Sequence, residues 1–376
     1  MNDVKKIAFL TGTRADFGKI KSLIQVLQHS EDFEVYIFAT GMHLQKEYGY
    51  TFIEIEKSGF KNISTFENQT HETTMDLTLA KTIEGFSAFV KKNKPDLIVI
   101  HGDRVEALAG AIVGSLNNKL VAHIEGGEIS GTIDELIRHS ISKLCHIHLV
   151  SNREAKKRLI QMGELSNTIF VIGSPDVDIM FSKSLPEINE VKRYYEISFD
   201  RYAIVMFHPV TTEVHSIKQN IDCLVETLLE SNRNYVIIYP NNDLGSTLII
   251  KAYEKLKGQI NFRILPSLRF EYFLTMLKNA DFVVGNSSAG VREAPYYNIP
   301  TINIGSRQLN RVNSESILNC EYGKKEITEA LHNIINYKNK NEKLNFGTGN
   351  SAQLFYKILK QKNLWHISNQ KQFNDI

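Results

Sequence analysis

The sequence predicts an α/β protein of two doubly wound, Rossmann-like domains that face a central cleft. Short apolar runs alternate with amphipathic helical stretches, which is the pattern of parallel sheets built from βα units. A chain of 376 residues is too long for one ordinary core and suits two domains. We therefore expect an N-terminal domain at residues 1–180 and a C-terminal domain at residues 181–376, with a C-terminal helix able to pack back on the first domain.

Apolar runs predict the strands of the first domain, and helical patterns lie between several of them. The expected strands are Ile7–Thr11, Val35–Ala39, Leu97–His101, Leu120–Ile124, Ile147–Val150 and Phe170–Ile172. The expected helices are Phe17–His29, Met75–Lys92 and Arg104–Leu116.

The second half repeats this rhythm after a polar, proline-containing connection at Met180–Arg201. Its expected strands are Ala203–Phe207, Tyr235–Tyr239, Phe262–Leu265, Phe282–Val284 and Thr301–Ile304. Its expected helices are Ile217–Ser231, Ser246–Leu256, Phe270–Lys278 and Ala289–Ala294. Ligands of such sheets bind at the carboxyl ends of the strands, so two facing domains would surround one ligand.

The charge balance argues against nucleic acid or a membrane surface as a partner. The formal net charge is +2, from 44 basic and 42 acidic side chains, and no charged tail stands out. The cysteines, Cys145, Cys223 and Cys320, follow neither a disulfide nor a metal-ligand spacing. The apolar run Ile7–Leu10 is too short for a signal peptide, and no stretch approaches a membrane span. We expect a cytoplasmic protein.

The turn after the first strand is a candidate phosphate site. A glycine-containing turn, Thr11-Gly12-Thr13-Arg14, joins a strand to a helix, which would leave backbone N–H groups for a phosphate beside the Arg14 guanidinium. The alternative is an ordinary βα turn in which Arg14 pairs with Asp16.

The segment Gly285–Glu293 resembles a second anion site. It follows an apolar strand and opens a helix with two hydroxyl residues, Ser287 and Ser288, which suits a pyrophosphate at a helix N-terminus. Glu293, in the early turns of that helix, could accept hydrogen bonds from two ribose hydroxyls. The alternative is a good N-cap followed by an acid that favours the helix.

Polar residues also follow three other strands of the second domain: His208, Asn241 and Arg307. Each alone is compatible with a structural role. Their recurrence at the ends of strands predicts a site that binds phosphate or sugar.

Carboxylates gather in the first domain instead. Asp103 and Glu125 end neighbouring apolar strands, and Asp134 follows nine residues after Glu125. Acids at neighbouring strand ends can share one pocket and divide the acid and base roles of a reaction. The alternative is that Asp103 caps the next helix and Glu125 pairs with an arginine.

Two other patterns favour structural roles. His139, Cys145, His146 and His148 match no usual metal-ligand spacing, so we expect neither a metal nor a cofactor. The basic run Arg153–Arg158 is typical of a solvated helix face.

Several strings together resemble the hydrolysing UDP-N-acetylglucosamine 2-epimerases of bacterial sialic acid synthesis. They run in order from about Ile7 to about Arg311: TGTRADFGK, HGDRVEALAGA, HIEGGEISGTIDELIRHSISKLCHIHLV, GSPDVD, FHPVTTE, YPNNDLG and GNSSAGVREAP. The resemblance implies a glycosyltransferase-B architecture, a UDP-sugar held mainly by the C-terminal domain, and a homodimer.

The resemblance also assigns roles to residues. Those implied to bind UDP are Arg14, His208, Asn241, Phe270, Ser287, Ser288, Glu293 and Arg307, with Phe270 near the uracil. The implied catalytic acids are Asp103, Glu125 and Asp134. Non-hydrolysing relatives follow their catalytic glutamate with a segment like AGLR, whereas here Glu125 precedes Gly126-Gly127-Glu128.

The implied reaction eliminates UDP to give 2-acetamidoglucal, which water then converts to N-acetylmannosamine. Three alternatives stay open: a sugar-transferring enzyme of the same architecture, a non-hydrolysing epimerase, and a binding protein without turnover. The substrate is a further choice, because similar enzymes act on UDP-N,N'-diacetylbacillosamine for legionaminic acid synthesis.

Overall fold

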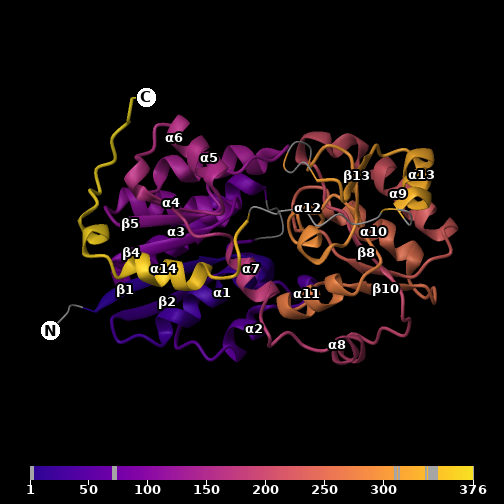
Figure 1. Ribbon diagram of the computed structural model, residues 1–376, viewed down its shortest axis with the longest axis horizontal. Coiled ribbons are helices and arrows are strands. Elements are labelled where there is room, and N and C mark those ends of the chain that lie inside the picture. Colours follow the sequence, from indigo (N-terminus) through magenta and orange to yellow (C-terminus); the bar gives the residue numbers. More distant parts are fainter. Residues whose placement is uncertain are drawn as a thin grey trace. The chain divides into compact units, whose positions relative to one another are not determined.

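The computed structural model describes residues 4–69, 74–308, 311, 314–334, 337 and 346–375 (Figure 1). The chain divides into two compact units. The first comprises Met1–Glu128, Asp134–Lys183 and Asn345–Ile376, and the second comprises Ile129–Ile133 and Ser184–Leu344. The main crossing after Lys183 falls inside the polar segment expected to connect the halves, and the chain returns to the first unit near its end.

The described part of the first unit contains a seven-stranded parallel sheet in the order β3-β2-β1-β4-β5-β6-β7. Its strands are β1 Lys5–Thr11, β2 Phe33–Ala39, β3 Asn62–Thr65, β4 Leu97–His101, β5 Leu120–Ile124, β6 Ile147–Val150 and β7 Ile169–Val171. Its helices are α1 Arg14–Gln28, α2 Phe52–Lys57, α3 Met75–Asn93, α4 Val105–Leu116, α5 Ile133–Leu144, α6 Arg153–Gln161, α7 Pro175–Met180 and α14 Ser351–Leu359.

The described part of the second unit contains a six-stranded parallel sheet in the order β10-β9-β8-β11-β12-β13. Its strands are β8 Ala203–Met206, β9 Tyr235–Ile238, β10 Phe262–Leu265, β11 Val283–Gly285, β12 Thr301–Ile304 and β13 Ile317–Cys320. Its helices are α8 Ile188–Tyr194, α9 Ile217–Glu230, α10 Ser246–Tyr253, α11 Phe270–Lys278, α12 Ala289–Arg292 and α13 Lys324–Asn333.

Both sheets share the strand order of a doubly wound nucleotide-binding fold, which confirms the predicted α/β class. In this order the direction of winding reverses between the first and fourth strands, and ligands bind at their carboxyl ends. The reversal lies between β1 and β4 in the first unit and between β8 and β11 in the second. The turns after these strands are therefore the places to search for a site.

Two strands, β3 and β13, were not among those expected. Each lies at an edge of its sheet, and neither is the continuous buried apolar run that marks a central parallel strand. The helix expected at Ala289–Ala294 is also shorter, because α12 ends at Arg292 and the turns that follow are a 3₁₀ helix at Ala294–Tyr297.

Helix α14 contributes to the first core although it comes last in the sequence. Phe355 is fully buried and meets Phe9 of β1 edge to face, with ring centroids 6.3 Å apart. The Asp178 carboxylate of α7 accepts hydrogen bonds from the backbone N–H groups of Ser351 and Ala352 at 2.8 and 2.7 Å. This carboxylate satisfies two of the N–H groups that open α14. Among the described residues, no helix is long and apolar enough to cross a membrane.

The segment after α14 ends at the last turn of α5. Lys371 Nζ donates hydrogen bonds to the carbonyls of Ser142 and Lys143, both at 2.9 Å, and lies 2.6 Å from the buried Glu164 carboxylate. Lysine is well suited to the last carbonyls of a helix because they carry partial negative charge. The C-terminal segment therefore holds one end of α5.

Glu164 connects this segment to β6. Burial alone would raise the pKa of Glu164, but hydrogen bonds from His148, Lys143 and Lys371 outweigh it and lower the pKa to about 2. The carboxylate therefore stays ionised in the folded protein at neutral pH.

Replacing Lys371 tests how much this contact stabilises the fold. We expect Lys371→Met to lower the free energy of unfolding at pH 7 by about 1–3 kcal/mol, because buried Glu164 loses a cationic partner. The folded pKa of Glu164, about 2, lies below its ordinary value of 4.5, so this stabilisation is present above pH 4.5 and is lost as the pH falls toward 2. The difference between the two proteins should shrink across that window.

Urea unfolding at several pH values measures this effect. The matched control is Lys362→Met, which removes an exposed lysine from the same C-terminal region. Equal stability of Lys371→Met and the parent protein at pH 7 would contradict the structural role.

Candidate active site

Glu125 occupies a strained and buried position at the end of β5. Its φ of +68° lies in the left-handed region, which non-glycine residues seldom adopt. Its side chain is almost inaccessible, and Oε1 accepts a hydrogen bond from Ser174 Oγ at 3.2 Å. Such strain persists where the surrounding structure holds the residue firmly, which is common at functional sites.

Two nitrogen groups also face Glu125 Oε1. His101 Nε2, at the end of β4, lies 3.4 Å away, and Lys19 Nζ, on α1, lies 3.6 Å away. Lys19 Nζ is also 3.5 Å from Asp176 Oδ2 on α7. One ammonium therefore lies close to two buried carboxylates.

Arg138, on α5, interacts with four acids of the first unit. Its side chain is fully buried and donates hydrogen bonds to the Asp103 carboxylate and, at 3.2 Å, to the Glu128 carbonyl. Burial alone would lower the pKa of this guanidinium, but the negative charges of Asp103, Glu128, Glu125 and Asp134 raise it overall. We call Arg138 and these four acids the carboxylate cluster.

The geometry of the cluster depends on the positions of α5 and of the turn after β4. Asp134 and Arg138 are four residues apart on α5, so they lie on one helix face. His123, on β5, lies 2.8 Å through Nε2 from the Gly102 carbonyl and 3.1 Å through Nδ1 from Ser142 Oγ. Burial lowers the pKa of His123 to about 3, so the ring is neutral. This ring connects the turn before Asp103 to α5.

The turn after β1 corrects one expectation. The backbone N–H groups of Gly12 and Thr13 donate to the Asp16 carboxylate at 2.9 and 3.0 Å, so they are not left for a phosphate. Thr13 and Asp16 form a capping box, in which each side chain accepts from the other's backbone. Arg14 is the first residue of α1 and is half-buried.

In the second unit, the fully buried Asn286 connects three strand ends. Its Oδ1 accepts from the His208 backbone N–H at 2.6 Å, and its Nδ2 donates to the His208 carbonyl at 2.9 Å. The Asn286 carbonyl accepts from Arg307 Nη1 at 3.2 Å and from Gln308 Nε2 at 3.1 Å. Asn286 therefore ties the residues after β8, β11 and β12 together.

The ring of His208 has a defined tautomer when neutral. Its Nδ1 accepts a hydrogen bond from the Asn241 backbone N–H at 3.1 Å, so the ring proton is on Nε2. His208 can therefore act as an N–H donor through Nε2.

The remaining predicted residues of the second unit lie in the turn after β11, in α12 and in α11. Gly285 has a φ of +137°, and a Cβ there would lie 2.0 Å from the Met206 carbonyl oxygen, so only glycine fits. Ser287 Oγ accepts from the Ala289 N–H at 3.3 Å, and Ser288 occupies the N-cap position of the short α12 without a capping hydrogen bond from its side chain. Glu293 is buried and directly follows the single turn of α12, and its N–H donates to the Ala289 carbonyl at 3.2 Å. Phe270, the first residue of α11, is buried and stacks on Phe273.

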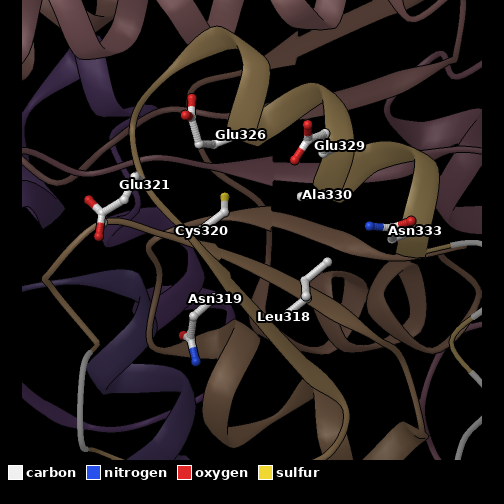
Figure 2. A pocket seen from close by; sticks show the side chains of 9 residues that line it. Leu318, Asn319, Cys320, Glu321, Glu326, Glu329, Ala330 and Asn333 are labelled. Atoms are coloured by element: carbon white, nitrogen blue, oxygen red, sulfur yellow. The ribbon is translucent and has the colours of Figure 1, made fainter.

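One hollow of this unit is lined by none of these residues (Figure 2). It has a volume of about 370 Å³ beside β13 and α13. Three of the residues that line it are Glu321, Glu326 and Glu329, whose negative charge does not suit a diphosphate.

The comparisons with known proteins assign the family. The model of the UDP-N-acetylglucosamine 2-epimerase family matches residues 25–360. The chain belongs to the UDP-N-acetylglucosamine 2-epimerase family. It is 46% identical over 376 residues to the UDP-N-acetylglucosamine 2-epimerase of Neisseria meningitidis serogroup B, covering 99% of this chain and 100% of that protein.

Two other relatives have informative names. The chain is 34% identical to polysialic acid biosynthesis protein P7 of Escherichia coli, covering 88% of this chain and 86% of that protein. It is 33% identical to a UDP-N,N'-diacetylbacillosamine 2-epimerase (hydrolyzing) of Legionella pneumophila, covering 95% and 96%. Among solved structures, the fold matches UDP-GlcNAc 2-epimerase of Methanocaldococcus jannaschii in complex with UDP-GlcNAc and UDP, with a TM-score of 0.80, 22% identity and coverage of 94% and 99%.

Within this epimerase-family chain, six of the predicted residues form two groups, one in each unit. In the first unit Asp103, Glu125 and Asp134 all interact electrostatically with Arg138. In the second unit Asn286 links His208 to Arg307, and the His208 ring links to Asn241.

Sequence reasoning missed several members of these groups. They are Lys19, His101, Arg138, Ser174, Asp176 and Asn286. All six lie within the strings that carry the family resemblance, so the signal was present, but only the folded chain shows their contacts.

The histidines near Cys145 have structural partners. His148 Nε2 lies 3.0 Å from Glu164 Oε2, and His146 lies within hydrogen-bond distance of the Val121 N–H and the Asn369 carbonyl. Burial raises the pKa of the Cys145 thiol, which keeps it protonated. In the portions of the chain that the structure describes, no group of three or more His, Cys, Asp or Glu residues is arranged to hold a metal ion.

Proposed function

We propose that the chain is a hydrolysing 2-epimerase that converts UDP-N-acetylglucosamine to N-acetylmannosamine and UDP. The carboxylate cluster around Arg138 is the observation that carries this proposal, because the reaction needs several acids at one reacting carbon. The Gly126-Gly127-Glu128 segment after Glu125 and the similarity to an enzyme named as hydrolyzing support the loss of UDP.

The first half of the proposed reaction is an elimination. The C2 proton of the sugar is only weakly acidic, and departure of UDP makes its removal feasible by leaving positive charge at C1. The C1–O electron pair leaves with UDP, and the C2–H pair forms the C1=C2 bond of 2-acetamidoglucal. We assign stabilisation of the departing diphosphate to Arg14, Arg307 and the Nε2–H of His208.

We assign the rest of the UDP contacts to the same unit as His208. Asn241, Ser287 and Ser288 supply polar groups at strand ends, Glu293 the ribose contact, and Phe270 the apolar surface for the uracil. Asn286 would hold this set in position, because it fixes the backbone of His208 and receives Arg307.

The second half of the proposed reaction is a hydration. Water adds hydroxide to C1 while a proton returns to C2 on the opposite face, which inverts that centre. Asp103, Glu125 and Asp134 share three roles: removing the C2 proton, returning one, and activating water. We also expect a cytoplasmic homodimer that needs no cofactor.

The choice of substrate rests on similarity. Identity of 46% to a UDP-N-acetylglucosamine 2-epimerase, against 33% to an enzyme named for UDP-N,N'-diacetylbacillosamine, favours the N-acetylglucosamine substrate. Similarity to a polysialic acid biosynthesis protein supports a role in sialic acid synthesis. The alternative is the same reaction on UDP-N,N'-diacetylbacillosamine for legionaminic acid synthesis.

Neutralising single acids tests the catalytic assignment. We expect Asp103→Asn and Glu125→Gln each to slow UDP release from UDP-N-acetylglucosamine by about 10²–10⁴-fold, because each removes a group that transfers a proton. UDP binding, measured by calorimetry, should change little. Glu154→Gln, at an exposed acid on α6, is the matched control. Near-normal turnover in both site variants would refute the assignment.

Mass spectrometry in heavy-oxygen water tests the reaction type. With UDP-N-acetylglucosamine alone, we expect free N-acetylmannosamine that carries one heavy oxygen at C1. A product still attached to UDP would indicate a non-hydrolysing epimerase, and release only with an added acceptor would indicate a transferase. A much higher kcat/KM for UDP-N,N'-diacetylbacillosamine would support the alternative substrate.

A further inference from the structure

His101 is a buried imidazole beside the carboxylate that the proposed reaction uses. It ends β4, its side chain is 7% exposed, and Nε2 lies 3.4 Å from Glu125 Oε1. The alignment of the two groups is not that of a hydrogen bond, and no other described residue pairs with Nε2. Contacts between catalytic groups are often loose before substrate binds and tighten in the complex.

Charged side chains lie around His101. Glu125 faces it directly, and Lys19 Nζ lies within 4 Å of both Glu125 and Asp176. Other charged or titratable groups near this set include Asp103, Arg138, His123 and Asp178.

His123 shows what a purely structural histidine looks like in the same sheet. It lies on β5, and its Cα pairs with Ile100, the residue before His101. Both of its ring nitrogens have hydrogen-bond partners, Gly102 and Ser142. His123 therefore has no nitrogen available for proton exchange, whereas His101 presents Nε2 to a carboxylate.

We propose that His101 is a proton carrier that restores the carboxylate form of Glu125 during the reaction. This inference rests on the proposed role of Glu125 in removing the C2 proton. Lys19 and Ser174 favour the Glu125 carboxylate as the resting form, which is the form that a base requires.

Glu125 takes the C2 proton while the C2–H pair forms the double bond and the C1–O pair leaves with UDP. The carboxylic acid then passes its proton to the Nε2 lone pair of neutral His101, which becomes an imidazolium, and the carboxylate is restored. The imidazolium releases this proton to solvent. The proton that returns to C2 comes from the water that adds to C1, through another carboxylate.

Chemical rescue tests this role. We expect His101→Ala to lose about 100-fold or more in deuterium incorporation at C2 in D₂O, because removing a positioned proton-transfer group costs about 10²–10⁴-fold. UDP affinity should be retained. Added imidazole should restore exchange through the cavity left by the side chain, whereas pyrazole, of similar size but far weaker basicity, should not.

The matched control is His123→Ala, in which imidazole and pyrazole should have equal effects. Equal rescue of His101→Ala by imidazole and pyrazole, or exchange at the parent rate without either, would overturn the proposal. If His101→Ala does not fold, His101→Gln keeps an N–H at this place without basicity. Loss of exchange in this folded variant supports the proposal, and parent-like exchange overturns it.

Deuterium exchange and UDP release are measured separately, so the two proposals can fail separately. If the parent protein incorporates deuterium at C2 but keeps UDP on its product, hydrolysis is excluded and the His101 test is unaffected. If the parent protein releases UDP and His101→Ala exchanges normally, the proposed function stands and the proton-carrier role is overturned.

Discussion

The ion pairs of the buried Arg138 constrain the rest of the first unit. A fully buried guanidinium is costly to desolvate unless carboxylates surround it, and four acids from the β4 turn, the β5 turn and α5 supply that charge. Arg138 in turn allows these acids to be close together without prohibitive repulsion. Two further contacts fix the position of α5. His123 connects α5 to the turn after β4, and Lys371 binds the C-terminal end of α5.

Much of this could be predicted from the sequence. Central parallel strands are buried on both faces, so they form continuous apolar runs, and Leu97–His101 and Leu120–Ile124 were predicted to the residue. Because strands of known order end at the same edge of a sheet, acids that follow them must lie near one another. This reasoning predicted that Asp103 and Glu125 lie close together. The family motif around them extended the prediction to Asp134.

The remainder depends on contacts between residues far apart in the sequence. Arg138, four residues after Asp134, is indistinguishable by spacing from an exposed helical ion pair, and its bond to Asp103 spans 35 residues. Asn286, between a glycine and two serines, is typical of a turn, and only its pairing with His208, 78 residues away, shows its role. The capping box of Thr13 and Asp16 was readable from the sequence, and it explains why the first turn does not offer its amides to a phosphate.

A double-mutant cycle between Arg138 and Asp103 tests the central claim most directly. Arg138→Met should lower the free energy of unfolding by about 3–5 kcal/mol, because it leaves buried carboxylates without their cation. Asp103→Asn in the same chain should recover part of this loss, with a coupling energy of about 1 kcal/mol or more in denaturant unfolding. Additive effects of the two substitutions would show that the guanidinium does not hold the acids together, and would contradict this account of the site.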